Sequence, residues 1–415
     1  MRDQTTHPVA AFWRTLTLAA RNLTRNRRRT GITLLGLLLG VAASLVLQAF
    51  VAGIFSLLGG IVVQGRTGAI QVHRVGHLQA DQDALRFTLP LDAAFMARLA
   101  KFPGVKAVTP RLSFEATIGN GSQSTLALVT AIDPATEDAV CPARYANLIG
   151  RPIAKGEVAM AVLGLKLADG LRAKNDDDLQ LLASGVSGQP NLLDVKLIGK
   201  VPAATEIDAR RMVITTLAQA QALVQMPGRV TEFAIALQRD DQADEVRDAL
   251  QAELGHDYQV VSWLDLLPQV RSMRLLLRSV LKVVVGVLLL LLVAAVANTM
   301  LMSVLERTRE IGTMLALGMK REAIGRLLLA EASVLGALGT LLGMGVGLFI
   351  VHLLYTHGVT FRPPGADVPA TMHPDVDMVS VAITVAIAFV GTVLAGVGPA
   401  KRAAKLSPAE CLRAV

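Results

Sequence analysis

Residues 283–305 read VVVGVLLLLLVAAVANTMLMSVL, and the charged segment ERTREIG follows directly at residues 306–312. The first stretch contains no charged side chain. About 20 helical residues, each advancing about 1.5 Å, cross a hydrocarbon layer of about 30 Å. Residues 283–305 are therefore predicted to form a transmembrane helix, and the charged segment is predicted to leave the membrane.

Three further stretches have the same apolar character: residues 31–63, residues 332–351 directly after Glu331, and residues 378–400. The 415-residue chain is 52% hydrophobic, with a mean hydropathy of +0.49, which argues against a simple soluble enzyme. The first stretch is too long, and begins too late, to be a signal peptide. We expect an α-helical membrane protein with four transmembrane helices plus a large extracytoplasmic α+β domain of two subdomains between helices 1 and 2.

The expected segments follow from these four stretches and the sequence between them. They are, in chain order, a cytoplasmic amphipathic helix (1–30), transmembrane helix 1 (31–60), a periplasmic domain (61–270), a stalk with transmembrane helix 2 (271–305), a cytoplasmic coupling helix (306–326), transmembrane helix 3 (327–355), a periplasmic loop (356–377), transmembrane helix 4 (378–400) and a cytoplasmic tail (401–415).

Positive charge is concentrated on one side of this arrangement. Residues 1–30 carry seven Arg and one Asp, and residues 305–326 carry five basic and three acidic side chains. Residues 61–282 carry 24 of each sign. Because cytoplasmic loops are enriched in Lys and Arg, both termini and the 306–326 loop are predicted to be cytoplasmic. Nucleic acid is not an expected partner, since the basic groups flank membrane helices and the soluble domain is neutral.

The large domain is predicted to mix helices and strands. Residues 91–100 are typical of a helix, and alternation over residues 105–118 followed by Asn120-Gly121 predicts a hairpin with residues 125–132. Residues 231–238, 242–254 and 258–262 are predicted as strand, helix and strand. We expect residues 61–132 and 231–262 to form one α+β subdomain and residues 133–230 to be an inserted, β-rich subdomain.

Three arginines precede the second apolar stretch on the predicted outer side. Arg271, Arg274 and Arg278 have a spacing that places them on one face of a helix, among leucines on both sides. We expect this segment to be a helical stalk that continues into the bilayer.

The sequence indicates neither a catalytic nor a metal site. No HExxH, CxxC or nucleophile-elbow motif occurs. His73 and His77 are four residues apart, as metal ligands on a helix would be, but Gly76 and the strand-like residues 70–72 argue against a helix there. Cys141 and Cys411 are predicted to face opposite compartments, so they are not expected to pair.

Gly339, Gly343 and Gly347 form a GxxxGxxxG ridge in the third apolar stretch. Such a ridge lets a second helix approach closely, and that helix could belong to the same subunit or to a dimer partner. Glu331 lies at the cytoplasmic start of this helix, where a carboxylate is costly unless water or a basic group is near. Further acids or histidines that would make it a proton relay are lacking.

The loop between the second and third apolar stretches is predicted to contain a short amphipathic helix ended by Gly318. A helix lying on lipid headgroups is one interpretation. A helix that docks into a partner is the other, because only a few residues separate its first turn from the membrane on either side. The residues expected to make that contact are Glu306, Arg309, Glu310, Ile311, Gly312, Leu315, Leu317 and Gly318.

These motifs together carry a family resemblance. ERTREIG at residues 306–312, ALG at 316–318, Glu331, the PA at 399–400 and PAECLR at 408–413 resemble the permease domain shared by FtsX, the lipoprotein-releasing LolC/LolE permeases and the MacB exporters. GAIQVH at 68–73 with GHL at 76–78 is nearer the LolE-like branch. The resemblance covers essentially the whole chain.

The resemblance implies that the 306–326 loop docks into an ABC ATPase subunit, present in two copies, which binds ATP and Mg. No GxxxxGK[ST] loop occurs in the chain, so no cofactor is expected in it and the ATPase is expected to be a separate protein. The implied setting is a bacterial inner membrane, with a second permease subunit as homo- or heterodimer and a periplasmic acceptor or adaptor protein as a further partner.

The implied mechanism is mechanical: ATP-driven closure of the ATPases moves the periplasmic domains, with no pore for substrate. Lipoprotein or lipid-type cargo released from the inner membrane is the leading expectation. A tripartite peptide or drug efflux pump and an FtsX-like module that controls cell-wall hydrolases are the alternatives.

Overall fold

The computed structural model describes residue 21 and residues 27–80, 85–186, 188–202, 206–361 and 369–406. The predicted amphipathic segment before residue 27 and the motif at 408–413 lie outside this part, apart from residue 21. The chain divides into two compact units. Met1–Ile54, Leu275–Val359 and Met372–Val415 form the helical unit, and Phe55–Arg274 and Thr360–Thr371 form the sheet unit.

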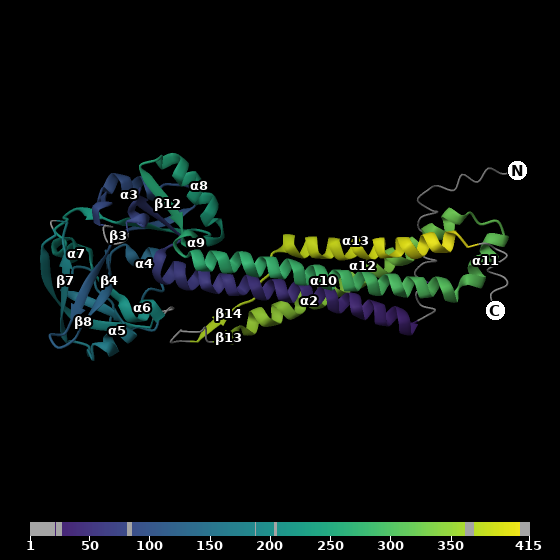
Figure 1. Cartoon of the computed structure of the whole chain (residues 1–415), viewed down its shortest axis with the longest axis horizontal. Coiled ribbons are helices and arrows are strands. Elements are labelled where there is room, and N and C mark those ends of the chain that lie inside the picture. The colour runs from purple at the N-terminus through teal and green to yellow at the C-terminus, as the bar shows by residue number, and fades with distance from the viewer. Residues whose placement is uncertain are drawn as a thin grey trace. The chain divides into compact units, whose positions relative to one another are not determined.

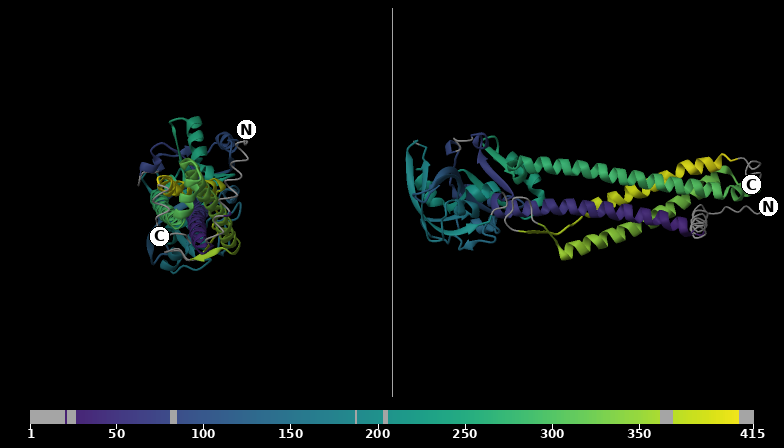
Figure 2. Two further views of the ribbon diagram at one scale, coloured as in Figure 1. Left: turned by 90° about the vertical axis from the view of Figure 1, so that its right-hand side faces the viewer. Right: turned by 60° about the horizontal axis from the view of Figure 1, so that its bottom comes forward.

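The helical unit contains two of the four long apolar helices whole and most of the other two, and within it they lie side by side in Figures 1 and 2. By length and composition each could cross a membrane. Their bounds are α2 (Arg27–Gly59), α10 (Pro268–Glu306), α12 (Arg321–His357) and α13 (Met378–Ala404), and the short α11 (Thr308–Ala316) lies between α10 and α12.

Each long helix extends beyond the apolar stretch that predicted it. The helix α2 passes without a break into a π-helix, η1 (Gly60–Thr67), and α13 continues through Pro399. Charge can mark where a helix leaves hydrocarbon, but the backbone stays helical until a residue or cap ends it. Apolar length therefore predicted the number of helices well and their ends poorly.

The glycine ridge of α12 packs against α2 of the same chain. A Cβ added at Gly339 would lie 2.6 Å from the Cβ of Leu37, and one added at Gly343 would lie 2.8 Å from the Cβ of Val41. At Gly347 the Cβ would lie 3.1 Å from the Cα of Ala42. The absence of side chains thus permits close contact within one subunit.

The sheet unit is built on a ten-stranded sheet in the described part of the chain, with order β12-β1-β11-β3-β4-β9-β6-β8-β5 and β7 paired with β3 and β8. Its strands are β1 (Ile70–Arg74), β3 (Val105–Gly119), β4 (Ser124–Ile132), β5 (Ile149–Gly150), β6 (Met160–Gly164), β7 (Asp178–Ser184), β8 (Pro190–Val201), β9 (Met212–Thr216), β11 (Glu232–Leu237) and β12 (Tyr258–Ser262). The strand β2 (Leu89–Pro90) pairs with β10 (Arg229–Val230), and β13 (Val359–Phe361) pairs with β14 (Ala370–Met372).

Short helices pack on this sheet. They are α3 (Ala93–Ala100), α4 (Glu137–Val140), α5 (Leu165–Gly170), α6 (Glu206–Arg211), α7 (Leu217–Leu223), α8 (Ala243–Leu254) and α9 (Trp263–Leu266), with 3₁₀ turns η2 (His77–Gln79) and η4 (Asp240–Gln242). The predicted helix at 91–100 is confirmed as α3. It begins after Asp92, whose side chain accepts a hydrogen bond from the Ala94 amide at 2.9 Å and caps the helix.

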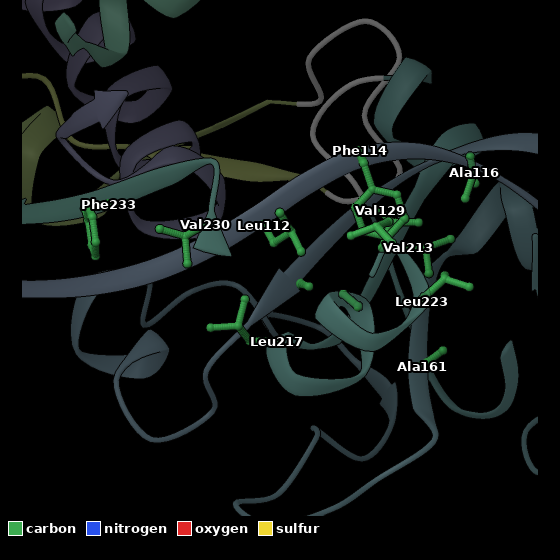
Figure 3. Close-up of a cluster of buried hydrophobic side chains, with 14 of the residues drawn as sticks. Leu112, Phe114, Ala116, Val129, Ala161, Val213, Leu217, Leu223, Val230 and Phe233 are labelled. Carbon is green, nitrogen blue, oxygen red and sulfur yellow. The ribbon is translucent and has the colours of Figure 1, made fainter. Parts of the chain in front are cut away.

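The predicted hairpin is also confirmed, as β3 and β4, and so are β11, α8 and β12 near the end of the unit. Alternate residues of β3 face the core, including Leu112, Phe114 and Ala116. Figure 3 shows Phe114 close to Val129 and Val213, which come from β4 and β9. One apolar core therefore contains strands from both predicted subdomains, and the division of residues 61–262 into two subdomains stays a prediction.

Candidate functional site

The segment after α10 forms the short helix that the sequence predicts. The helix α11 ends before Gly318, whose φ is +91°, a conformation that favours glycine. The Gly318 amide donates to the Leu315 carbonyl at 3.0 Å, and the Met319 amide donates to the Met314 carbonyl at 3.0 Å. This left-handed cap ends the helix, and α12 begins at Arg321.

The residues expected to contact a partner do not share one environment. Ile311 and Gly312 are buried, and Ile311 belongs to the apolar core of the helical unit. Leu317 is 83% exposed. The other members divide between exposed (Glu306, Arg309, Gly318) and half-buried (Glu310, Leu315). The exposed face also includes Met319, which the sequence prediction missed.

Arg307 joins α11 to α12. Its Nη1 donates to Glu331 Oε1 at 2.9 Å and its Nε donates to Glu310 Oε2 at 3.1 Å. Glu331 is only 3% exposed. Burial alone would lower the pKa of Arg307, but the carboxylates of Glu331 and Glu310 outweigh burial and raise that pKa. The carboxylate of Glu331, which the sequence predicts to be costly, therefore has a basic partner in Arg307.

A second ion pair joins α2 to the end of α10. Arg29 Nη1 donates to Glu306 Oε2 at 2.9 Å, and Arg29 Nη2 donates to the Thr299 carbonyl. One turn away, the Thr33 hydroxyl donates to the Thr299 hydroxyl at 3.0 Å. We call Arg29, Glu306, Arg307, Glu310 and Glu331 the junction cluster, since together they tie α2, α10, α11 and α12 to one another.

The sheet unit holds the far end of the first long helix through buried arginines. The Arg66 carbonyl, in η1, accepts from Arg111 Nη1 at 2.8 Å and from Arg144 Nη2 at 2.7 Å. Carbonyls in the last turn of a helix lack intrahelical partners and carry the negative end of the helix dipole. Two guanidinium groups therefore cap this helix.

Glu137 holds both of those arginines in place. Its carboxylate accepts from Arg111 Nε at 3.0 Å and Nη2 at 2.7 Å, and from Arg144 Nε at 2.6 Å. Burial alone would raise the pKa of Glu137, but the charges of Arg111 and Arg144 outweigh it and lower that pKa. We call Arg111, Glu137 and Arg144 the capping cluster.

The start of α10 is anchored by Asp265. Its carboxylate accepts from Arg247 Nη1 at 2.7 Å, from Arg271 Nη1 at 2.6 Å and from the Ser262 amide at 3.0 Å. Burial alone would raise the pKa of Asp265, but the hydrogen bond from Arg247 leads the contacts that lower it.

The three predicted stalk arginines differ in their surroundings. Arg271 pairs with Asp265, whereas the Arg274 guanidinium lies 5.9 Å from the ring centroid of Phe55, within cation–π range. Arg278 is exposed. The stalk is one uninterrupted helix with the following apolar stretch, as α10.

One group of side chains that the sequence did not select as a site comes together in the sheet unit. His73 in β1 pairs in register with Glu232 in β11, and His77 follows in η2. Among the described residues, these three form a set of His, Cys, Asp or Glu side chains close enough to hold a metal ion. Burial, then the nearby His77, lowers the pKa of His73 to about 3.

Two family models match this chain, each over a different part of it. Residues 282–408 match the family model described as FtsX-like permease C-terminal. Residues 30–253 match the one described as MacB-like periplasmic core domain. The prediction of a family resemblance is thereby confirmed.

Two curated relatives and one solved structure illustrate the similarity. The macrolide export ATP-binding/permease protein MacB of Hyphomonas neptunium is 25% identical, over 98% of this chain and 61% of its own length. The pyoverdine export ATP-binding/permease protein PvdT of Pseudomonas aeruginosa is 26% identical, over 99% of this chain and 59% of its own length. The periplasmic region of MacB from Actinobacillus actinomycetemcomitans matches 51% of this chain and 94% of its own, at 12% identity and a TM-score of 0.35.

The chain thus spans about three fifths of the length of these curated relatives. Four long apolar helices and a periplasmic-type domain describe a membrane protein. With its two family matches covering most of the sequence, the chain belongs to the FtsX-like permeases that carry a MacB-like periplasmic core domain.

Proposed function

We propose that this chain is the permease subunit of an ABC transporter in a bacterial inner membrane, and that it transmits force from an ATPase to a periplasmic domain. In this proposal both termini and α11 are cytoplasmic, and the sheet unit, most of which lies between α2 and α10 in the chain, is periplasmic. The excess of basic residues before α2 and around α11 supports that orientation.

The observation that carries the proposal is the continuity of α10. This helix has 39 residues without a break, which corresponds to a length of roughly 58 Å. Asp265 holds Arg271 near its first turn, and the junction cluster holds its last residue, Glu306. A helix fixed at both ends can transmit a displacement that a flexible linker would absorb.

The capping cluster likewise fixes one end of the helix formed by α2 and η1, so this helix could also transmit a displacement. Because Arg111 and Arg144 both bind the Arg66 carbonyl, movement of this helix must carry the strand β3 and the segment after α4 with it. Movement of either long helix would therefore change the sheet unit, without a substrate pore between the helices.

The ATP-binding function is proposed to lie outside these 415 residues, as two copies of an ABC ATPase that bind ATP and Mg. The exposed residues of α11 and its cap, Arg309, Leu317 and Met319, are the proposed contact. The other predicted contact residues are proposed to shape and position that surface, and not all of them would touch the partner. They are Glu306, Glu310, Ile311, Gly312, Leu315 and Gly318.

A second permease subunit is proposed to cover α10. Leu275, Leu276 and Val280 are exposed by 60%, 63% and 48%, and they precede the predicted membrane stretch. Apolar side chains outside hydrocarbon favour a protein partner. Both a homodimer and a heterodimer fit this surface.

The cargo is proposed to be handled on the periplasmic side. The curated relatives named above are exporters of macrolides or pyoverdine, which favours export of a small molecule or peptide together with a periplasmic adaptor. Release of a lipoprotein or lipid-type cargo is the second candidate, supported by the LolE-like GAIQVH and GHL motifs. An FtsX-like regulator of cell-wall hydrolases is the third.

The proposal is tested by tagging the chain in its own cells and identifying the ATP-binding protein that co-purifies from detergent. Leu317→Glu should abolish co-purification and ATP-dependent transport, because it places a charge at the centre of the proposed contact. Leu192→Glu is the matched control, since Leu192 is 57% exposed on β8 in the sheet unit. Normal ATPase binding and transport by the Leu317 variant would show that α11 is not the contact.

A further inference from the structure

Four polar side chains gather on one face of the sheet unit beside the capping cluster. His73 lies opposite Glu232 in the β1–β11 ladder, and Gln71 lies on the same face of β1 two residues earlier. Gly76, at φ +92°, turns the chain so that His77 returns over His73. The potential ligand atoms of His73, His77 and Glu232 all lie within 4.8 Å of one another.

A neutral His73 ring cannot satisfy both of its hydrogen-bond contacts. Its Nδ1 lies 3.2 Å from the Thr231 carbonyl oxygen and its Nε2 lies 3.0 Å from Gln71 Oε1. The Gln71 amide is oriented by its Nε2, which donates to the Thr67 carbonyl at 2.9 Å. A neutral imidazole supplies one N–H, but these two contacts both need a donor on the ring.

A bound cation resolves this mismatch. If Nδ1–H donates to the Thr231 carbonyl, the lone pairs of His73 Nε2 and Gln71 Oε1 face each other in a buried place. Two ligand atoms of a tetrahedral ion, each at about 2.0–2.2 Å, lie roughly 3.3–3.6 Å apart, so the observed separation of 3.0 Å would have to widen only slightly. A metal-bound histidine commonly donates its other ring nitrogen to a backbone carbonyl in this way.

We propose that His73, His77 and Glu232 form a site for a divalent transition-metal ion of the zinc class, with Gln71 or water as the fourth ligand. Two imidazoles and one carboxylate are a common zinc-binding set. The proposal is independent of the proposed transport function, since it concerns metal binding by the sheet unit.

The neighbouring charges leave Glu232 available for the metal. Arg111 Nη1 is 3.8 Å from Glu232 Oε1, beyond hydrogen-bond distance. Every nitrogen of the Arg111 guanidinium instead donates elsewhere, to Glu137, to the Arg66 carbonyl and to Cys141. Glu232 therefore balances charge near Arg111 without being held by it.

Metal binding requires His77 to turn. The two imidazole rings are stacked, with centroids 4.8 Å apart and planes at 12°, and parallel rings cannot direct their lone pairs at one ion. His77 is half-buried in the short η2 turn, outside the β1 ladder, so turning its ring would not break a strand pair. The metal would thus tie η2 to β1 and β11.

The full-length protein in detergent, treated with chelator and then dialysed against Zn²⁺, should retain one zinc per chain by elemental analysis. Co²⁺ should give the visible d–d absorption of a tetrahedral site. His77→Ala should weaken Zn²⁺ binding by at least about 100-fold, beyond the 10–100-fold typical of losing an outer-shell partner. Glu232→Gln should do the same while preserving the shape of the side chain.

His357→Ala is the matched control, because His357 is exposed and belongs to the helical unit rather than to the sheet unit that holds the site. It should bind zinc like the unaltered protein. If Glu232→Gln fails to fold, the zinc affinity of His77→Ala alone tests the proposal. Less than one tenth of a zinc per chain, or equal affinity in the unaltered protein and His77→Ala, would overturn the proposal.

Discussion

Glu137→Gln should strongly destabilise the sheet unit, because it removes the carboxylate that three buried N–H donors share. Glu137 is fully buried, and Arg111 and Arg144 are 1% and 4% exposed. Removing one member of a buried ion pair typically costs about 3–5 kcal/mol, since the remaining charge stays buried. At roughly 2–4 °C per kcal/mol for a unit of this size, the midpoint of thermal unfolding should fall by roughly 6–20 °C.

Unfolding can be followed by the fluorescence of Trp263, which is buried in α9, in a Trp13→Phe background of the full chain in detergent. Glu253→Gln is the matched control. Its partner Arg98 is 53% exposed and Glu253 is 44% exposed, so the loss should stay below about 1 kcal/mol. A Glu137→Gln cost no larger than that of the control would refute the structural role of the capping cluster.

The carboxylate of Glu137 also predicts how the stability of the sheet unit changes with pH. Its pKa is lowered on folding, so its contribution to stability is present above the ordinary value of 4.5 and is lost as the pH falls through the lower folded value. The unaltered protein should therefore lose stability below about pH 4.5 more steeply than Glu137→Gln. If the free energy of unfolding fell equally with pH in the two proteins, Glu137 would not be the carboxylate responsible for the acid sensitivity.

Two further predictions concern the helical unit. Gly343→Ala should cost about 1–3 kcal/mol in detergent unfolding, because the new Cβ would lie 2.9 Å from the Leu38 carbonyl oxygen. Gly345→Ala should instead stabilise by up to about 1 kcal/mol, since nothing lies within 4 Å there and alanine is the better helix former. Arg307→Gln should destabilise by about 3–5 kcal/mol by removing the ion pair of Glu331, and adding Glu331→Gln should recover most of that loss. Equal stability of the two glycine variants, or no recovery in the double variant, would contradict these contacts.

Much of the fold follows from sequence patterns with a direct physical cause. An uncharged stretch long enough to cross hydrocarbon predicts α10 whatever packs around it, and the alternation in residues 112–118 predicts the buried face of that part of β3. The end of α11 was predictable from Gly318, because few other residues adopt its backbone conformation.

The features that the sequence missed depend on pairing between distant segments. His73 and Glu232 meet only because β1 pairs with β11 in one register, and no local signal encodes that register. Arg111 lies in a strand where a charge is normally taken as solvent-facing, but Glu137 and a helix end compensate it in the interior. Local patterns identify elements, whereas buried polar sites require the assembled sheet.

The uninterrupted stalk is the central claim, and the most direct measurement is the nucleotide-dependent distance between spin labels on the sheet units of two permease copies. The label would be placed at Leu192→Cys, with Cys411→Ser and the buried Cys141 retained. A second protein would carry Ser279→Gly, Val280→Gly and Leu281→Gly, since each interior glycine costs a helix about 1 kcal/mol. ATP trapping should change the distance in the intact stalk but not in the glycine variant, with the ATPase bound in both. An equal change in both proteins, or transport without any change in the intact stalk, would contradict transmission through α10.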